Sequence, residues 1–187
     1  MHSKDFRDQR ETAMSLKPPV GPSDHAQGPR DAPIVVVEYG DFECPYCGAA
    51  YPELKAVQEA LGDKLCFVFR NFPLSNAHPH ALQAAGFAEA AATVGRFWEM
   101  HDMLFTHQNA LDDRSLRRYA QEVGLGGDLI DAAVSGAFES KVRAHFSSGV
   151  RSGVNGTPCL FINGQRWEGP AEAEVLIPEL REIAARR

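Results

Sequence analysis

Several features are missing from the 187-residue sequence, and each absence excludes a class of protein. No apolar run is long enough to span a bilayer as a helix. Lys and Arg number only 19 against 25 Asp and Glu, so the formal net charge is -6 at pH 7. Nucleic acids and anionic membranes attract proteins with an excess of positive charge, so we expect neither as a partner.

Cysteine is also scarce. Four cysteines in a chain of this length are too few for a disulfide-rich secreted fold. The hydrophobic content of 44% is enough for a full core without a disulfide scaffold or a structural metal. Only Cys44 and Cys47 have the spacing of a known motif. The sequence therefore predicts a redox or a metal-binding role for this pair.

The first 30 residues lack the apolar segment that forms the centre of a secretory signal. Prolines and glycines recur from residue 18 onward, so we expect a flexible leader over residues 1–31. Without a signal, the protein is expected in the cytoplasm. If these residues replace a signal that was removed, the expected location becomes the periplasm.

Two apolar runs, residues 34–37 and 65–69, are typical of buried strands. Between them, apolar residues recur at helical spacing from Cys47 to Leu61, which predicts a helix that begins near Pro45. Strands joined in this way through a helix are parallel. We expect the first run to be the central strand of a sheet.

The rest of the chain is expected to be mainly helical and to end in a hairpin and a helix. Apolar periodicity and separating glycines predict helices over residues 81–94, 97–105, 116–123 and 137–150. Asn163-Gly164 between two short strand-like segments predicts the hairpin. An amphipathic pattern over residues 171–185 predicts the last helix. This order indicates an α/β layer architecture with a helical insertion.

The cysteine pair lies where the first helix is expected to begin. Cysteines at positions i and i+3 share one face, close enough for a disulfide that opens and closes with little backbone movement. Free N–H groups and the positive end of the helix dipole favour a thiolate at Cys44, and the thiolate is the form that attacks disulfides. Cys47, one turn further in, should be more buried and act as the resolving thiol.

Glu38 lies six residues before Cys44, at the end of an otherwise apolar strand. An unpaired carboxylate is costly to bury, so we expect the pKa of Glu38 to be raised. A carboxyl group that titrates near neutral pH could relay a proton to and from Cys47. The alternative is that Glu38 merely reaches solvent at the strand end.

Several motifs combine into one pattern: residues 37–47 with Cys-Pro-Tyr-Cys, Pro52, Gly156-Thr157-Pro158, and residues 72–74, 78–81 and 95–102. This pattern resembles the DsbA-like thioredoxin-fold thiol-disulfide oxidoreductases over roughly residues 18–187. The resemblance implies a thioredoxin fold, with a βαβ unit, a β-hairpin and a C-terminal helix. Its first part would cover residues 32–76, a helical insertion residues 77–136, and its second part residues 137–187.

The same resemblance implies the details of the site. The Thr157–Pro158 bond would be cis and lie beside the cysteine pair, and Thr157, Pro158, Pro45 and Tyr46 would contact the substrate. Implied partners are proteins with thiols or disulfides, and a redox partner such as glutathione or a thioredoxin-type reductant. No cofactor is implied.

Charges near the pair bear on the direction of electron flow. Between Glu38 and Leu54 there are four acids and no Lys, Arg or His. Negative neighbours should raise the pKa of Cys44 and make the pair less oxidising. We therefore expect a moderately reducing or isomerase-like catalyst.

Other interpretations stay open. Cys-Pro-Tyr-Cys is also a glutaredoxin motif, which would make the chain a glutathione-dependent reductase. A thioredoxin-like module could instead be non-catalytic, or could bind zinc or copper through the pair with His78, His80 or Cys159. We expect Cys66 to be a buried, inert thiol. Cys159 directly follows Pro158, so it could be a third redox-active thiol.

Overall fold

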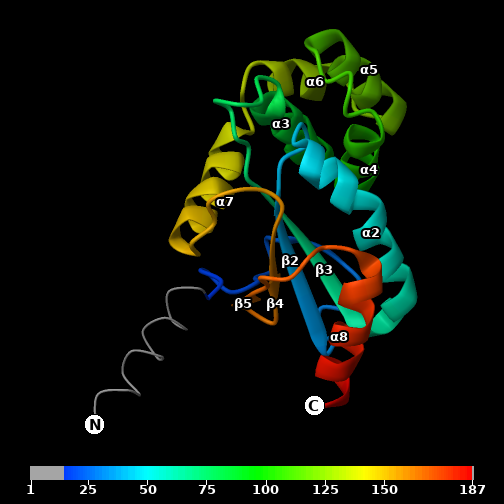
Figure 1. Cartoon of the computed structure of the whole chain (residues 1–187). Coiled ribbons are helices and arrows are strands. Elements are labelled where there is room, and N and C mark those ends of the chain that lie inside the picture. The colour runs from blue at the N-terminus through cyan, green and yellow to red at the C-terminus, as the bar shows by residue number, and fades with distance from the viewer. Residues whose placement is uncertain (1–14, 187) are drawn as a thin grey trace.

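A computed structural model describes residues 15–186 of the chain (Figure 1). The described part is built around a five-stranded sheet with the order β1-β3-β2-β4-β5. The strands are β1 (His25–Gln27), β2 (Ile34–Gly40), β3 (Leu65–Asn71), β4 (Cys159–Ile162) and β5 (Gln165–Arg166). The mixed α/β architecture and the central position of β2 are as expected from the sequence.

β2 and β3 are parallel and are joined by helix α2 (Pro45–Leu61) and the short 3-10 turn η1 (Gly62–Lys64). All seven residues of β3 are buried, as are six of the seven in β2. Strands that are buried on both faces have continuous apolar runs in the sequence, which is why both strands could be predicted. The expected βαβ unit is confirmed.

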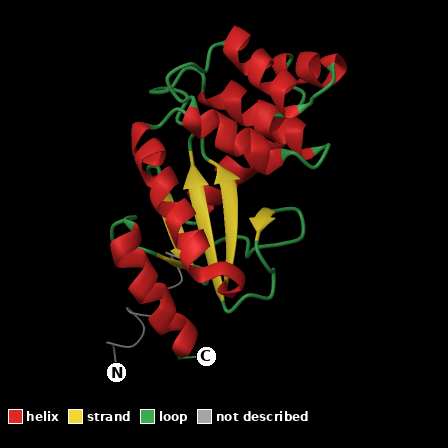
Figure 2. Cartoon of the chain, turned by 90° about the vertical axis from the view of Figure 1, so that its right-hand side faces the viewer, coloured by secondary structure: helices red, strands yellow, loops and turns green. Residues whose placement is uncertain are grey.

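Four helices follow β3: α3 (Ala81–Ala92), α4 (Phe97–Thr106), α5 (Asp113–Val123) and α6 (Gly127–Val134). Figure 2 shows this helical group beyond the ends of the two long strands, and Figure 1 shows it above the point where α2 begins. The sequence did not predict α6, an eight-residue helix in a glycine-rich stretch. The division into residues 32–76, 77–136 and 137–187 stays a prediction.

Helix α7 (Glu139–Arg151) leads to the β4–β5 hairpin, and α8 (Ala173–Ala185) ends the described chain. Asn163 and Gly164 both have positive φ, 49° and 82°, as expected of a two-residue turn between antiparallel strands. The hairpin and the last helix are confirmed.

The expected flexible leader is wrong for residues 15–31. Within them, β1 pairs antiparallel with β3 and extends the sheet. The N–H of Lys17 also donates to the hydroxyl of Ser152 at 2.8 Å. Proline and glycine made this segment irregular, but contacts distant in sequence order it. Residues 1–14, the rest of the expected leader, lie outside the described residues.

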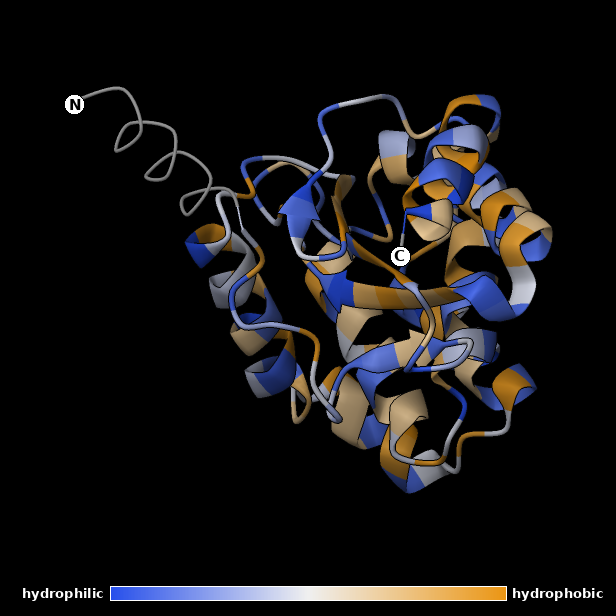
Figure 3. Cartoon of the chain, turned by 90° about the horizontal axis from the view of Figure 1, so that it is seen from below, coloured by the Kyte–Doolittle hydropathy of each residue, from blue (hydrophilic) through white to orange (hydrophobic). Residues whose placement is uncertain are grey.

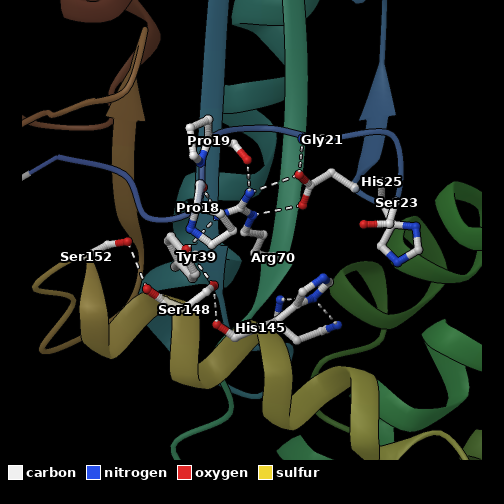
Figure 4. A network of polar contacts seen from close by, with 12 residues as sticks. Pro18, Pro19, Gly21, Ser23, His25, Tyr39, Arg70, His145, Ser148 and Ser152 are labelled. Atoms are coloured by element: carbon white, nitrogen blue, oxygen red, sulfur yellow. Dashed lines mark hydrogen bonds and ion pairs between the residues drawn. The ribbon is translucent and has the colours of Figure 1, made fainter.

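Arg70 holds much of this segment in place (Figure 4). Its side chain is 2% exposed, and its guanidinium group forms two hydrogen bonds to the carboxylate of Asp24, at 2.8 and 2.9 Å. It also donates to the carbonyl oxygens of Pro18 and Pro19 and to the hydroxyl of Tyr39. A buried cation needs such partners, and the N-terminal segment supplies most of them.

The two faces of the sheet carry different helices. Alternate residues of a strand point to opposite faces. Ile34 and Val36 belong to the larger core with α2 and α8, whereas Val37 and Tyr39 belong to a smaller core on the side of α7 (Figure 1). In Figure 3 the helices carry both hydrophilic and hydrophobic segments, in keeping with one buried face each. By the same alternation, Glu38 faces the side of α2.

Candidate active site

Cys44 occupies the N-cap of α2, with an extended backbone at φ -71° and ψ 122°, and Pro45 begins the helix. Proline suits this position because the first N–H groups of a helix have no intrahelical partner. The N–H of Cys44 donates to the carbonyl of Asp41 at 3.1 Å, which turns the chain from β2 into the helix. The remaining free N–H groups of the first turn lie around the Cys44 thiol.

The two thiols of the pair are perturbed in opposite directions. The pKa of Cys44 is lowered to about 5, and the largest cause is a hydrogen bond from the Cys47 thiol. Burial acts in the opposite direction, whereas hydrogen bonds with Thr157 and with the N–H groups of Cys47 and Tyr46 lower the pKa further. Burial, followed by the hydrogen bond to Cys44 and the charge of Glu38, raises the pKa of Cys47 well above its usual value. Cys47 is fully buried and Cys44 is 3% exposed. The structure therefore gives one thiolate and one deep thiol, one helical turn apart.

The expectation that acidic neighbours raise the pKa of Cys44 is wrong. Asp41 is fully buried, and its carboxylate accepts hydrogen bonds from the N–H groups of Glu43 and Leu74, both at 2.8 Å. It also pairs with the imidazole Nδ1 of His78 at 2.7 Å. Burial acts to lower the pKa of His78, but the hydrogen bond and charge of Asp41 and the charge of Cys44 outweigh it and raise that pKa.

A second histidine pairs with a second acid in the same way. The carboxylate of Glu43 lies 2.9 Å from Nδ1 of His80 and accepts the His80 N–H at 2.6 Å. Sequence reasoning considered His78 and His80 as part of the family pattern and as possible metal ligands, but not as partners of the acids. Their position more than 30 residues beyond the motif hid them from a count of local charge. Among the described residues, no group of three His, Cys, Asp or Glu side chains could hold a metal ion.

Glu38 is 2% exposed, so the alternative that it reaches solvent is wrong. In the sheet it lies between Phe69 of β3 and Leu160 of β4, and its Oε1 has no hydrogen-bond partner in the described structure. Burial, and then the charge of Cys44, raises its pKa to about 8. The rise expected from the sequence is confirmed. Because Glu38 also acts on the pKa of Cys47, the two groups are electrostatically coupled.

The Thr157–Pro158 bond is cis and lies beside the cysteine pair. The Cys44 thiol, when protonated, donates to the carbonyl oxygen of Thr157 at 3.4 Å, across 113 positions of sequence. Between the cysteines, Pro45 and Tyr46 lie on the surface, and Tyr46 is 73% exposed. The structure thus brings together all seven residues named from the sequence pattern around one dithiol.

The two other cysteines lie on the opposite face of the sheet. Cys66 pairs in register with Val35 and Cys159 with Tyr39, and both thiols belong to the core on the α7 side. Burial raises the pKa of both. With β2 between them and four residues of offset, they are more than about 10 Å apart, too far for a disulfide. The structure does not bring Cys159 to the Cys44–Cys47 pair.

The sequence model of the thioredoxin family matches residues 21–177. The chain belongs to the thioredoxin family. Among solved structures, it is similar to oxidised BdbD from Bacillus subtilis, with 21% identity and a TM-score of 0.77 over 87% of this chain and 93% of that one. It is also similar to α-DsbA1 from Wolbachia pipientis, with 20% identity and a TM-score of 0.78 over 89% of this chain and 94% of that one. These similarities show that the fold is the one seen in DsbA-type structures.

Curated relatives match at higher identity but over a small part of their length. The chain is 46% identical over 174 residues to "Na(+)/H(+) antiporter NhaA 3" of Salinispora tropica, which covers 89% of this chain and 26% of that protein. The chain is also 43% identical to "Na(+)/H(+) antiporter NhaA 1" of Mycolicibacterium gilvum, in a match that covers 89% of this chain and 28% of that protein. The chain thus spans about a quarter of the length of these relatives.

Among residues 15–186, no helix has both the length and the apolar character needed to cross a bilayer.

Proposed function

We propose that this chain is a protein thiol–disulfide oxidoreductase that exchanges disulfides with protein substrates through Cys44 and Cys47. The observation that carries the proposal is the split between the two thiols. Cys44, with a pKa near 5, is a thiolate at neutral pH, and Cys47 one turn away stays protonated. An attacking thiolate beside a protonated resolving thiol is the arrangement that such exchange needs.

In the oxidising direction, a substrate thiolate attacks Sγ of Cys44 in the Cys44–Cys47 disulfide. A mixed disulfide forms, and Cys47 leaves as a thiolate that takes a proton from Glu38. A second substrate thiolate then attacks the substrate sulfur of the mixed disulfide and releases Cys44 as a thiolate. Two electrons pass from the substrate dithiol to the pair, and the substrate gains one disulfide. The reducing direction is the reverse, with Glu38 accepting the proton of Cys47.

Glu38 suits this proton transfer because its pKa of about 8 lies close to neutral pH. The carbonyl oxygen of Thr157, next to Pro158, lies 3.4 Å from the Cys44 sulfur, and the surface residues Pro45 and Tyr46 directly follow Cys44 in the chain. We propose that a substrate segment binds between these two pairs of residues, next to the attacking sulfur.

We further propose that the pair is more oxidising than the dithiol of thioredoxin. The sequence predicted a moderately reducing or isomerase-like catalyst because it predicted a raised pKa for Cys44. In the structure that pKa is lowered instead. A stabilised thiolate favours the reduced pair and so makes its disulfide a better oxidant. Equilibration with glutathione buffers should give a potential above the value of about -270 mV for thioredoxin. A value at or below that figure would refute this direction.

The proposal concerns this chain alone, because it matches only about a quarter of the length of its curated relatives. A recycling partner such as glutathione or a thioredoxin-type protein belongs to the proposal. If turnover requires glutathione and no other thiol replaces it, the glutaredoxin-like alternative is favoured instead.

Insulin reduction with dithiothreitol as the electron donor tests the exchange activity. We expect the wild-type chain to accelerate it, Cys44→Ser to abolish the acceleration, and Cys47→Ser to accumulate mixed disulfides through Cys44. A chain whose Cys44→Ser variant matches the wild type would be a non-catalytic thioredoxin-like module.

A further inference from the structure

Gln108, in the segment between α4 and α5, reaches across to the first turn of α2. Its side-chain Nε2 donates to the carbonyl oxygen of Cys44 at 2.7 Å and to that of Phe42 at 3.0 Å. One carboxamide of the helical insertion therefore binds two backbone carbonyls, that of Cys44 itself and that of Phe42 two residues earlier. The side chain is partly buried in this position.

The other end of the same carboxamide faces Gly48. A Cβ atom added to Gly48 would lie 2.2 Å from Oε1 of Gln108 and 2.9 Å from its Cδ. Glycine inside a helix is less favourable than alanine by about 1 kcal/mol. At residue 48 it leaves the room that Gln108 occupies. The two carbonyl acceptors also fix the orientation of the carboxamide, because only its NH2 group can donate to them.

These contacts bear directly on the thiolate. The N–H groups of Tyr46 and Cys47, which help to lower the pKa of Cys44, belong to the turn that Gln108 holds. The carbonyl of Cys44 accepts both from Gln108 and from the N–H of Gly48 at 3.0 Å, the first hydrogen bond of the helix. A looser first turn would aim those N–H groups less well at the sulfur.

We propose that Gln108 is a positioning residue of the dithiol site, acting together with Gly48. Its side-chain hydrogen bonds go to the backbone carbonyls of Phe42 and Cys44, so it acts through the backbone around the reacting sulfur. The helical insertion thus contributes to the nucleophilicity of Cys44. The relevance of this contact to exchange rests on the function proposed above, whereas its effect on the pKa of Cys44 does not.

The first test compares Gln108→Ala with Gln83→Ala, a control glutamine of α3 that is also partly buried and whose side chain bonds only to Asp113 in the described structure. The pKa of Cys44 is read from the pH dependence of its alkylation, with the labelled residue identified by mass spectrometry. The looser turn should cost the thiolate about one net hydrogen bond from the N–H groups of Tyr46 and Cys47, which raises this pKa by about 0.5 to 1 unit in Gln108→Ala, and Gln83→Ala should leave it unchanged. Below the pKa, alkylation should be about three- to tenfold slower.

The second test asks whether Gly48 and Gln108 act as one unit. Gly48→Ala should displace the carboxamide and raise the pKa of Cys44 about as much as Gln108→Ala does. In the double variant the added methyl group meets no carboxamide, so the pKa should match that of Gln108→Ala alone. Additive increases would show that Gly48 acts independently and would overturn the pairing.

Thermal unfolding of each variant separates a loss of folding from a change at the site. A Gln108→Ala protein that is folded and has the wild-type pKa and alkylation rate would overturn the inference. The function can fail separately: if the wild type does not reduce insulin but Gln108→Ala still shifts the pKa of Cys44, the exchange activity is refuted and the positioning role stands.

Discussion

Replacing Glu38 with Gln should stabilise the protein, and increasingly so as the pH rises. The buried carboxyl group has a folded-state pKa of about 8 against an ordinary value of 4.5. Below 4.5 both the folded and the unfolded chain hold the proton, so Glu38 costs little. As the pH rises from 4.5 towards 8, the unfolded chain ionises while the folded chain does not, and the folded state becomes progressively less favoured. Gln has no such titration.

The size of the effect follows from the two pKa values. The interval between 4.5 and about 8, at about 1.36 kcal/mol per pKa unit, corresponds to about 5 kcal/mol above pH 8. At pH 7 only the interval from 4.5 to 7 counts, which gives about 3 kcal/mol. These are upper figures, because the unpartnered Oε1 can draw in water when it ionises.

Urea unfolding of the reduced protein between pH 4 and 9 measures this difference. Glu59→Gln, on the exposed side of α2, serves as the matched control and should show no comparable pH-dependent gain. We expect the curves of wild type and Glu38→Gln to converge near pH 4 and to separate above pH 6. A Glu38→Gln protein that is less stable than wild type at pH 8, or a gap that does not change with pH, would refute the reasoning.

Three further predictions concern Arg70, His78 and Cys66. Arg70→Met should lower the free energy of unfolding by about 3 to 5 kcal/mol, since it leaves the carboxylate of Asp24 buried without its cation; an effect below about 1 kcal/mol in urea unfolding would contradict the role of this pair. His78→Gln should cost about 1 kcal/mol near pH 6, because the raised folded-state pKa makes the pairing with Asp41 stabilising below the unfolded pKa. That cost should fall as the pH rises through the folded-state value, and a constant cost in unfolding curves from pH 5 to 9 would count against it. Cys66, buried in β3 with a raised pKa, should be alkylated only after unfolding, and labelling of the folded protein would disprove its inert role.

Features with a local cause were predictable from the sequence. Continuous apolar runs predicted the strands β2 and β3. Asn163-Gly164, a dipeptide that tolerates positive φ, predicted the turn of the hairpin. The raised pKa of Glu38 followed from a single fact, a carboxyl group at the end of a buried strand. In each case, the residues that determine the outcome are neighbours in the chain.

Features with a distant cause were missed. The segment 15–31 looked flexible because its order depends on Arg70 and Ser152, which no local pattern connects to it. β1 is only three residues long and carries no apolar alternation of its own. It forms a strand because the edge of β3 offers it partners. Tertiary contacts here override local composition.

The error over Cys44 came from a count of charges that leaves hydrogen bonds out, and the structure also shows what the acids of the motif do. Counted locally, Asp41 and Glu43 are negative charges beside a thiolate. In the structure each is bound to a histidine from the loop before α3, so the acids attach that loop to the start of α2. With Gln108 on the same turn, two distant segments hold the residues around the sulfur. The pKa of Cys44 is lowered mainly by the hydrogen bond from the Cys47 thiol, with help from the N–H groups of Cys47 and Tyr46 in this turn. A count of charges leaves these hydrogen bonds out, which explains why it gave the wrong sign.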